Sequence, residues 1–406
     1  DTTAPASQKT QGVVTTGGDN QVAGYWNSGN TGVDITVPIA DDSSINGGTV
    51  QLLVSTDGGG SFVPLDTPST ISAVNTNKTI SVAGGVLEGV AGFGESDVLQ
   101  FKATITDTSG NATTGTVSDT TLTVDQTAAT ISTSSIASDN ATVTLAKTGD
   151  TVTLTIATNE NVSSPTVTFT SGGAAATNAD TVSGASPGTS FTSAYTVDAS
   201  DTDGTVAISI TATDVAGNTT SGFTTISAGS VTVDTTAPAS QKTQGVVTTG
   251  GDNQVAGYWN SGNTGVDITV PIADDSSING GTVQLLVSTD GGGSFVPLDT
   301  PSTISAVNTN KTISVAGGVL EGVAGFGESD VLQFKATITD TSGNATTGTV
   351  SDTTLTVDQV APEVDTFTMN DTVLKSGETS AVTIIFSEAV TGFSSDDDVT
   401  APNGTL

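Results

Sequence analysis

The first 126 residues of the chain recur without a single substitution as residues 234–359. Two enzyme domains of one chain seldom stay identical, because each active site usually specialises. Identical copies suit a chain whose function depends on its length, because each repeated module that stacks end to end adds the same increment. The repeat therefore favours a structural role.

The charge balance excludes several classes of partner. The 406 residues include 42 acidic and 8 basic residues, for a net charge of −34, and every basic residue is Lys. Such a chain has no basic stripe to displace the counterions of a nucleic acid, and it is poorly suited to an anionic membrane surface. The acidity is compatible with many bound hard cations. We expect no nucleic-acid partner and no membrane insertion, because no apolar run is long enough to span a bilayer.

The sequence offers little material for catalysis. His, Cys and Arg are all absent, so the chain has no imidazole base, thiolate nucleophile or guanidinium clamp. The absence of Cys also excludes disulfides and thiolate metal sites. A pair of carboxylates can hydrolyse glycosides, but the acids here fall in turns without a pocket-forming insertion. We therefore expect a protein that is not an enzyme.

Three similar junctions divide the chain. Each ends a strand on Asp and continues through a short connector, at Thr123–Ala129, Thr232–Pro238 and Thr356–Pro362. The junctions predict a module A at residues 1–125, a module B at 126–234, a second module A at 235–358 and a partial module C at 359–406. The start at Asp1 looks like the second half of a junction, so we expect an excerpt of a longer chain.

Alternation of apolar and polar residues is the dominant local pattern. Val152, Leu154 and Ile156 alternate with Thr, and the segment Val98–Asp107 has the same period of two. Strands of this kind belong to antiparallel sheets with one solvated face. No stretch shows a helical period. We predict an all-β chain of tandem immunoglobulin-like antiparallel β-sandwich domains with about seven strands each, forming an elongated rod.

The last domain of that rod is predicted to be incomplete. Its residues suggest three strands, near Val364–Met369, Ala381–Phe386 and Val399–Leu406. Three strands are too few to close a sandwich, and the open edge of the sheet would be adhesive.

Several motifs carry a family resemblance. They are the Val-Asp-x-x-Ala-Pro junctions, the Asp-x-x-Gly-Asn turns, Thr158–Val162 and Phe386–Phe393. In order and recurrence they resemble the bacterial immunoglobulin-like tandem repeats of giant secreted calcium-dependent adhesins of Gram-negative bacteria. The resemblance implies an extracellular or bacterial cell-surface location and calcium ions at the domain junctions. Module A is longer than a typical repeat, and its segment Gln11–Asn30 has no obvious counterpart in module B.

The Asp-x-x-Gly-Asn turns place acids at the entrance of each module. They lie at Asp107–Asn111, Asp214–Asn218 and Asp340–Asn344, 18 to 20 residues before a junction Asp. This spacing predicts the hairpin between the last two strands, at the end where the chain enters the sandwich. The loop between the second and third strands lies at the same end.

The entrances, together with acidic loops at the opposite exit ends, give the candidate metal ligands. At the amino terminus they are Asp1, Asp41, Asp42 and Asp107, and between A and B they are Asp125, Glu160 and Asp214. Between B and the second A they are Asp234, Asp274, Asp275 and Asp340, and between that module and C they are Asp358 and Glu388. The exit loops add Asp97, Asp201, Asp203 and Asp330.

Crowded carboxylates repel one another unless a cation neutralises them. Ca²⁺ fits best because it accepts six to eight oxygen ligands in flexible geometry, whereas Mg²⁺ requires a stricter octahedron. Zinc prefers His or Cys, which are absent. Two simpler interpretations stay open: the turns use Asp only to accept backbone N–H groups, or the acids only keep the surface soluble.

Smaller signals favour structural roles. Ser55–Phe62 resembles the Asp-box hairpin, which is a fold-stabilising turn. Tyr25 with Trp26 is either a sugar-stacking platform or partial core, and we favour core. The acidic run Asp396–Asp398 is typical of a solvated loop.

These observations predict an extender segment of a secreted bacterial surface adhesin, in which calcium stiffens the junctions and neighbouring modules of the same chain are the partners. One alternative is a subunit of a self-assembling fibre or surface layer, in which another copy donates strands to residues 359–406. Another is direct binding of sugar or ice through arrays of Thr.

Overall fold

The computed structural model describes residues 1–18, 21–179, 182–251 and 254–405, which form two compact units, Asp1–Thr235 and Thr236–Leu406. The first unit contains modules A and B, and the second contains the second module A and module C. Three separate hydrophobic clusters lie within modules A, B and second A. Each module is therefore held by its own core.

The first module A is a sandwich of two sheets. One sheet has the order β1-β3-β6, and the other has the order β2-β9-β7-β4-β5 with β8 beside β7. Neighbouring strands are antiparallel except for β2, which runs parallel to β9. The elements are β1 (Gln11–Thr16), β2 (Tyr25–Trp26), β3 (Gly32–Ile39), η1 (Ser43–Ile45), β4 (Thr49–Ser55), β5 (Val63–Thr70), β6 (Thr76–Ala83), α1 (Gly84–Glu88), β7 (Val98–Thr106), β8 (Ala112–Thr114) and β9 (Leu122–Val124).

The core of this module lies between its two sheets. Ile35 of β3 and Phe101 of β7 belong to one buried cluster, although they lie in different sheets. Alternate residues of β7 are buried and half-buried from Leu99 to Thr106, as the period-two pattern predicts. The all-β, immunoglobulin-like sandwich fold is thus confirmed.

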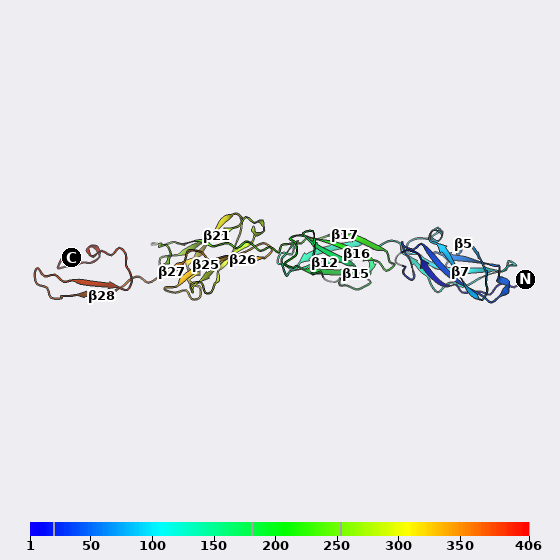
Figure 1. Ribbon diagram of the computed structural model, residues 1–406, viewed down its shortest axis with the longest axis horizontal. Helices are drawn as coiled ribbons and strands as arrows, with labels where there is room; N and C mark the ends of the chain where they lie inside the picture. The colour runs from blue at the N-terminus through cyan, green and yellow to red at the C-terminus, as the bar shows by residue number, and fades with distance from the viewer. Residues whose placement is uncertain (19–20, 180–181, 252–253, 406) are drawn as a thin grey trace. The chain divides into compact units, whose positions relative to one another are not determined.

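Module B repeats this architecture. Its sheets have the orders β10-β12-β15 and β11-β18-β16-β13-β14, with β17 beside β16, and β11 runs parallel to β18 as β2 does to β9. Figure 1 shows β12, β15, β16 and β17 together in the green part of the chain. The strands are β10 (Ile131–Ser138), β11 (Leu145–Ala146), β12 (Thr151–Val162), β13 (Thr166–Ser171), β14 (Ala174–Ala175), β15 (Gly188–Thr196), β16 (Gly204–Thr213), β17 (Thr219–Phe223) and β18 (Thr232–Val233).

The second module A has the sheet orders of the first. Its elements are β19 (Gln244–Thr249), β20 (Tyr258–Trp259), β21 (Gly265–Ile272), η2 (Ser276–Ile278), β22 (Thr282–Ser288), β23 (Val296–Thr303), β24 (Thr309–Ala316), α2 (Gly317–Glu321), β25 (Val331–Thr339), β26 (Ala345–Thr347) and β27 (Leu355–Val357).

Strand number and helix content differ from the prediction. Each of the modules A, B and second A contains nine strands in its described part instead of about seven, because short edge segments such as β2 and β8 form separate strands. Short helices also occur, which a search for helical period cannot detect. Leu87 of α1 is buried, and Trp26 Nε1 donates to Glu88 Oε1 at 3.1 Å. Trp26 is fully buried, which confirms a core role and excludes a sugar platform on its ring.

Module C differs from its prediction at the carboxyl end. Strands β28 (Val364–Met369) and β29 (Val382–Phe386) pair antiparallel, as expected. The third predicted strand is wrong over residues 399–405, which contain no strand, and Leu406 lies outside the described residues. The acidic run instead forms α3 (Ser395–Asp398), where three carboxylates occupy the first turn of the helix. Pro402, Asn403 and Gly404 then favour a turn over a strand.

The Asp-box segment is a hairpin turn between β4 and β5, as predicted. The Asp57 carboxylate accepts hydrogen bonds from Ser55 Oγ at 2.5 Å and from Ser61 N at 3.0 Å, which hold its pKa well below the usual range. Among the described residues, no helix is long and apolar enough to cross a bilayer.

Because each module has its own core, we expect the two A modules to unfold independently. Replacing Phe101 by Ala removes a fully buried ring from the first module A and should lower its free energy of unfolding by about 3–5 kcal/mol. The second module A, with Phe334 in the same place, should keep its stability. In denaturant titrations followed by tryptophan fluorescence, the variant should show two transitions from Trp26 and Trp259. Phe334→Ala serves as the mirror control, and a single shifted transition would contradict independent cores.

Candidate metal centre between modules A and B

The Asp-x-x-Gly-Asn motif forms a tight turn between β16 and β17. Asp214 Oδ1 accepts from the backbone N–H groups of Ala216 and Asn218, both at 2.9 Å. Asp214 Oδ2 accepts from Asn218 Nδ2 at 3.1 Å. Gly217 has φ of +98°, which a residue with a Cβ rarely adopts. The motif therefore fixes both the hairpin and the direction of its Asp side chain.

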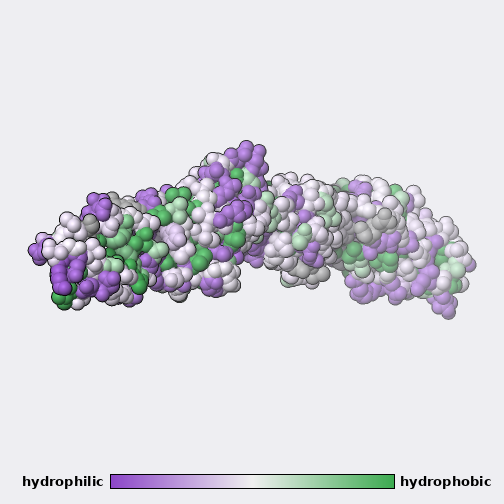
Figure 2. Space-filling view, turned by 60° about the vertical axis from the view of Figure 1, so that its left-hand side comes forward, coloured by the Kyte–Doolittle hydropathy of each residue, from purple (hydrophilic) through white to green (hydrophobic). Residues whose placement is uncertain are grey.

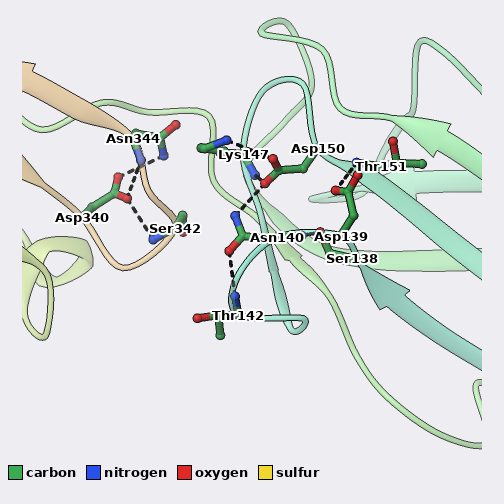
Figure 3. A network of polar contacts seen from close by, with 10 residues as sticks. All are labelled: Ser138, Asp139, Asn140, Thr142, Lys147, Asp150, Thr151, Asp340, Ser342 and Asn344. Atoms are coloured by element: carbon green, nitrogen blue, oxygen red, sulfur yellow. Dashed lines mark hydrogen bonds and ion pairs between the residues drawn. The ribbon is translucent and has the colours of Figure 1, made fainter.

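The same turn recurs in the second module A. Asp340 Oδ1 accepts from Ser342 N and Asn344 N at 2.9 Å, and Oδ2 accepts from Asn344 Nδ2 at 3.0 Å (Figure 3). The structural part of the motif is thus independent of the residues at its two central positions, which are Val-Ala in B and Thr-Ser in A.

The junction residue Asp125 is brought to this turn by the strand that precedes it. Asp125 follows β9, and its backbone N–H donates to Trp26 O at 2.9 Å. Asn218 Nδ2 donates to the Asp125 carbonyl at 2.9 Å and approaches Asp125 Oδ1 at 3.3 Å. The hairpin of module B is therefore fastened to the connector that leaves module A.

Glu160 completes the group from a different element than predicted. It lies within β12, not in a loop, because this strand extends to Val162, which forms a β-bridge with Asp214. Carboxylate oxygens of Asp125, Glu160 and Asp214 all lie within 4.8 Å of one another. Within residues 1–18, 21–179, 182–251 and 254–405, no other three His, Cys, Asp or Glu side chains gather in this way.

The charges of this cluster are not compensated by a Lys ion pair. The three ion pairs found in the described part of the chain are Lys9–Asp119, Lys147–Asp150 and Lys242–Asp352. Partial burial, followed by repulsion from Asp214, Glu160 and Glu95, raises the pKa of Asp125 to about 6. Burial and the charge of Asp214 also raise the pKa of Glu160. The site thus holds negative charge at an electrostatic cost.

The donor set fits a hard cation. Three carboxylates supply oxygen ligands, and the Asp125 carbonyl lies at the same turn. Oxygen donors of this kind are those that Ca²⁺ accepts in flexible geometry, and the repulsion among them is what a divalent ion relieves. Mg²⁺ uses similar oxygens but demands stricter geometry.

At the amino terminus, the predicted acids serve local structure. Asp107 Oδ1 accepts from Ser109 N at 2.8 Å, and Asn111 Nδ2 donates to the Asp1 carbonyl at 3.2 Å. Asp42 caps η1 by accepting from Ser44 N at 2.9 Å, and Asp41 precedes it in the same loop. These four acids do not form a three-carboxylate group in the described structure.

The remaining entrance acids divide between the two units. Asp234 lies in the first unit, where its backbone N–H donates to Ala146 O at 2.9 Å. Asp274 and Asp275 belong to the second unit, where Asp275 caps η2, and Asp340 holds its hairpin. A metal site formed by these residues stays a prediction. Asp358 and Glu388 line one cavity of about 730 Å³ beside module C.

The exit-loop acids mostly accept local hydrogen bonds. Asp201 is buried and accepts from Thr177 N at 3.2 Å and from Asp198 N at 2.9 Å. Asp203 accepts from Thr235 N at 2.6 Å. Asp97 Oδ2 is buried without a hydrogen-bond partner, and Asp330 precedes β25 in the second module A.

Sequence reasoning missed the residues of module A that meet the hairpin of B. Asn27 Nδ2 donates to Ala216 O at 2.7 Å, and Ser28 Oγ donates to Asn218 Oδ1 at 2.7 Å. Their sequence, Asn-Ser-Gly-Asn, is a recognisable turn signal. Nothing in the sequence, however, shows that this turn faces the next module.

Comparisons with known proteins agree with the family resemblance for part of the chain. Residues 358–406 match the family described as bacterial Ig-like domain. No curated protein is significantly similar to the chain.

Three solved structures are among those to which the chain is similar. A tetra-tandem repeat in the extending region of a large adhesion protein is 19% identical, with a TM-score of 0.24, over 94% of this chain and 88% of that chain. Chicken CNTN1 domains are 10% identical, with a TM-score of 0.29, over 87% and 99% of the two chains. An I-band fragment of titin is 9% identical, with a TM-score of 0.32, over 80% and 93%.

The raised pKa of Asp125 predicts a pH dependence of stability. An unfolded Asp has a pKa of about 3.9, so between pH 4 and 6 the folded state keeps a proton that the unfolded state has lost. In EGTA, this contribution to the free energy of unfolding should therefore fall as the pH rises through that window. Asp125→Asn, which carries no charge, should melt higher than the wild type at pH 7 and close to it at pH 4.

Scanning calorimetry of the full chain at both pH values measures this difference. Asp358→Asn, at the equivalent position of the second module A, controls for the general loss of one negative charge. An Asp125→Asn effect of the same size at pH 4 and pH 7 would show that the carboxylate cluster does not raise this pKa.

Proposed function

We propose that this chain is an extender segment of a secreted bacterial surface adhesin whose junction between modules A and B is stiffened by calcium. The observation that carries the proposal is the meeting of Asp125, Glu160 and Asp214 at a covalent joint between two sandwiches. One of these ligands comes from the connector and two come from the following module, so an ion bound to all three couples both modules. The chain then acts by holding a distal binding domain away from the cell, without catalysis.

The chemistry of the site supports calcium for this role. The Asp214 carboxylate is already oriented by its hairpin, and the backbone of Asp125 is held beside it by the bond from Asp125 N to Trp26 O. Extracellular modules bind calcium at about 10⁻⁴–10⁻³ M. Such sites fill in tissue fluid or sea water and stay empty in the cytosol, so the chain would stiffen only after export.

The extender proposal also draws on the repeat. Residues 1–126 and 234–359 are identical, and the chain resembles bacterial immunoglobulin-like repeats at its junctions and turns. The family match of residues 358–406 supports the same interpretation.

Removing one ligand tests the calcium proposal. Asp125→Asn lowers the charge of the donor set, so calcium binding at this site should weaken by roughly tenfold or more. In isothermal titration calorimetry, the full-chain variant should bind one calcium ion fewer than the wild type in the affinity range of this site. In small-angle scattering, calcium should increase the maximum dimension of the wild type more than that of the variant.

Asp358→Asn is the matched control, because Asp358 has the same preceding sequence but no three-carboxylate group in the described structure. Unchanged heats in Asp125→Asn, together with identical scattering profiles of the wild type in calcium and in EGTA, would remove calcium from the junction.

A second candidate function is self-assembly by strand addition at module C. Its sheet consists of β28 and β29 alone in the described residues, and apolar side chains of both strands are exposed. Phe367 is 57% exposed and Ile385 is 49% exposed. Figure 2 shows green, hydrophobic atoms exposed among purple and white ones toward its left-hand side. An edge of this kind can accept a strand from another copy.

This second function predicts association that depends on concentration. Phe367→Ser should shift the full chain toward monomer in sedimentation velocity, because it removes a ring that an added strand would cover. Val247→Ser, which replaces a similarly exposed residue (59%) of the second module A, is the control. A wild type that is monomeric at all concentrations would exclude strand addition between copies.

A further inference from the structure

A turn of the first module A, at the end of the sandwich that meets module B, is held by its own hydrogen bonds. This turn, Asn27–Asn30, connects β2 and β3 and is named here the exit turn. Asn27 N donates to Asn30 Oδ1 at 2.8 Å, and Gly29 N donates to Asn27 Oδ1 at 3.0 Å. Asn27 and Asn30 are both buried. The exit turn therefore presents its remaining donors in fixed directions.

Those donors meet the Asp-x-x-Gly-Asn hairpin of module B. Asn27 Nδ2 donates to Ala216 O at 2.7 Å. The backbone N–H and the hydroxyl of Ser28 donate to Asn218 Oδ1 at 3.0 and 2.7 Å. On the far side of its amide, Asn218 donates to the Asp125 carbonyl and to Asp214. One Asn side chain thus joins the exit turn, the connector and the hairpin.

We propose that the exit turn of module A is a recognition site for an Asp-x-x-Gly-Asn hairpin, and that it locks A to B without a metal ion. The three contacts use only neutral donors and acceptors, and Ala216 and Asn218 are buried where they form. Their geometry does not depend on neutralising the neighbouring carboxylates. The lock therefore holds the hairpin of the module that follows A, independently of the proposed calcium.

The second module A shows that the exit turn is formed in advance. Its identical turn, Asn260–Asn263, has the same internal bonds, from Asn260 N to Asn263 Oδ1 at 2.8 Å and from Gly262 N to Asn260 Oδ1 at 3.0 Å. Residues 359–406 contain no Asp-x-x-Gly-Asn sequence. There the turn borders the cavity of about 730 Å³ instead of a hairpin of this class. Its shape is therefore a property of module A and not of the partner.

Module B carries a different exit turn. At the corresponding place after β11 stands Lys147–Asp150, in which the Lys147 backbone N–H donates to Asp150 Oδ2 at 2.8 Å and Lys147 Nζ to Asp150 Oδ1 at 2.9 Å (Figure 3). In module B, an ion pair replaces the two Asn side chains of the turn. The amide that, in module A, donates to Ala216 O is therefore absent. The two kinds of module thus carry exit turns of different chemistry.

Distance measurements on the full chain test the lock. Because the chain has no Cys, spin labels attach only to introduced cysteines, at Ser81 of β6 and Thr155 of β12, which are both exposed. In EGTA, electron–electron resonance should give one narrow distance distribution for the label pair. Asn27→Ser with Ser28→Ala should broaden it at least twofold, because Ser can still cap the turn but cannot reach Ala216.

Asn260→Ser with Ser261→Ala is the matched control and should leave the distribution unchanged. Ser28→Ala alone, which breaks no bond within the turn, should give an intermediate width. The lock is overturned if, in EGTA, the double variant and the wild type have distance distributions of the same width, whether both are narrow or both are broad.

The same samples separate the lock from the calcium proposal. Suppose that the wild type has a narrow distance distribution in EGTA and that added calcium does not narrow the distribution of the double variant. The lock then stands and calcium stiffening fails. Suppose instead that the wild type and the variant have equally broad distance distributions in EGTA, and that calcium narrows the distribution of the wild type. The lock then fails and calcium stiffening stands.

Discussion

The junction between modules A and B depends on the hydrogen bonds that Asp214 accepts from its own hairpin. These bonds to Ala216, and those to Asn218, hold the turn in one conformation. That conformation places one carboxylate beside Asp125 and one amide against Ser28. A single turn thus creates both an acidic cluster and a neutral contact, so the cation site and the lock are two consequences of one local structure.

The carboxylates of the acidic cluster repel one another, and two kinds of cation, a proton or a divalent metal ion, can reduce this repulsion. Partial burial and repulsion from Asp214 and Glu160 raise the pKa of Asp125 to about 6, so a proton on this carboxylate can neutralise one charge. A divalent ion neutralises two charges and also binds the connector to the module that follows. Because both act on the same carboxylates, protons and calcium compete, and a junction that binds calcium near pH 7 would release it more readily in acid. The neutral contacts of Asn27 and Ser28 have no such dependence.

Much of this arrangement could be predicted from the sequence. Alternation identified β7, β12 and β16, since a half-buried strand must repeat every two residues. The Asp-x-x-Gly-Asn spacing located the hairpin and brought Asp125, Glu160 and Asp214 into one hypothesis. Glu160 lies in β12 and not in the predicted loop. This strand extends beyond its apolar pattern, because Val162 forms a bridge with Asp214, which is distant in sequence. The role of Asn27 was hidden because a turn motif specifies its own conformation but not its neighbour.

The two copies of module A separate what a module determines alone from what its neighbour adds. Their exit turns have the same bonds, and their tryptophans donate to Glu88 and Glu321 at the same distance of 3.1 Å. In the described residues, the junction Asp of the first copy meets a second and a third carboxylate, from Glu160 and Asp214, and that of the second copy is in no such group. Identical sequences therefore give identical exit turns, whereas the residues that face each turn belong to the module that follows. In such a chain, the order of modules determines the chemistry of each junction, because the same face of module A meets module B in one place and module C in the other.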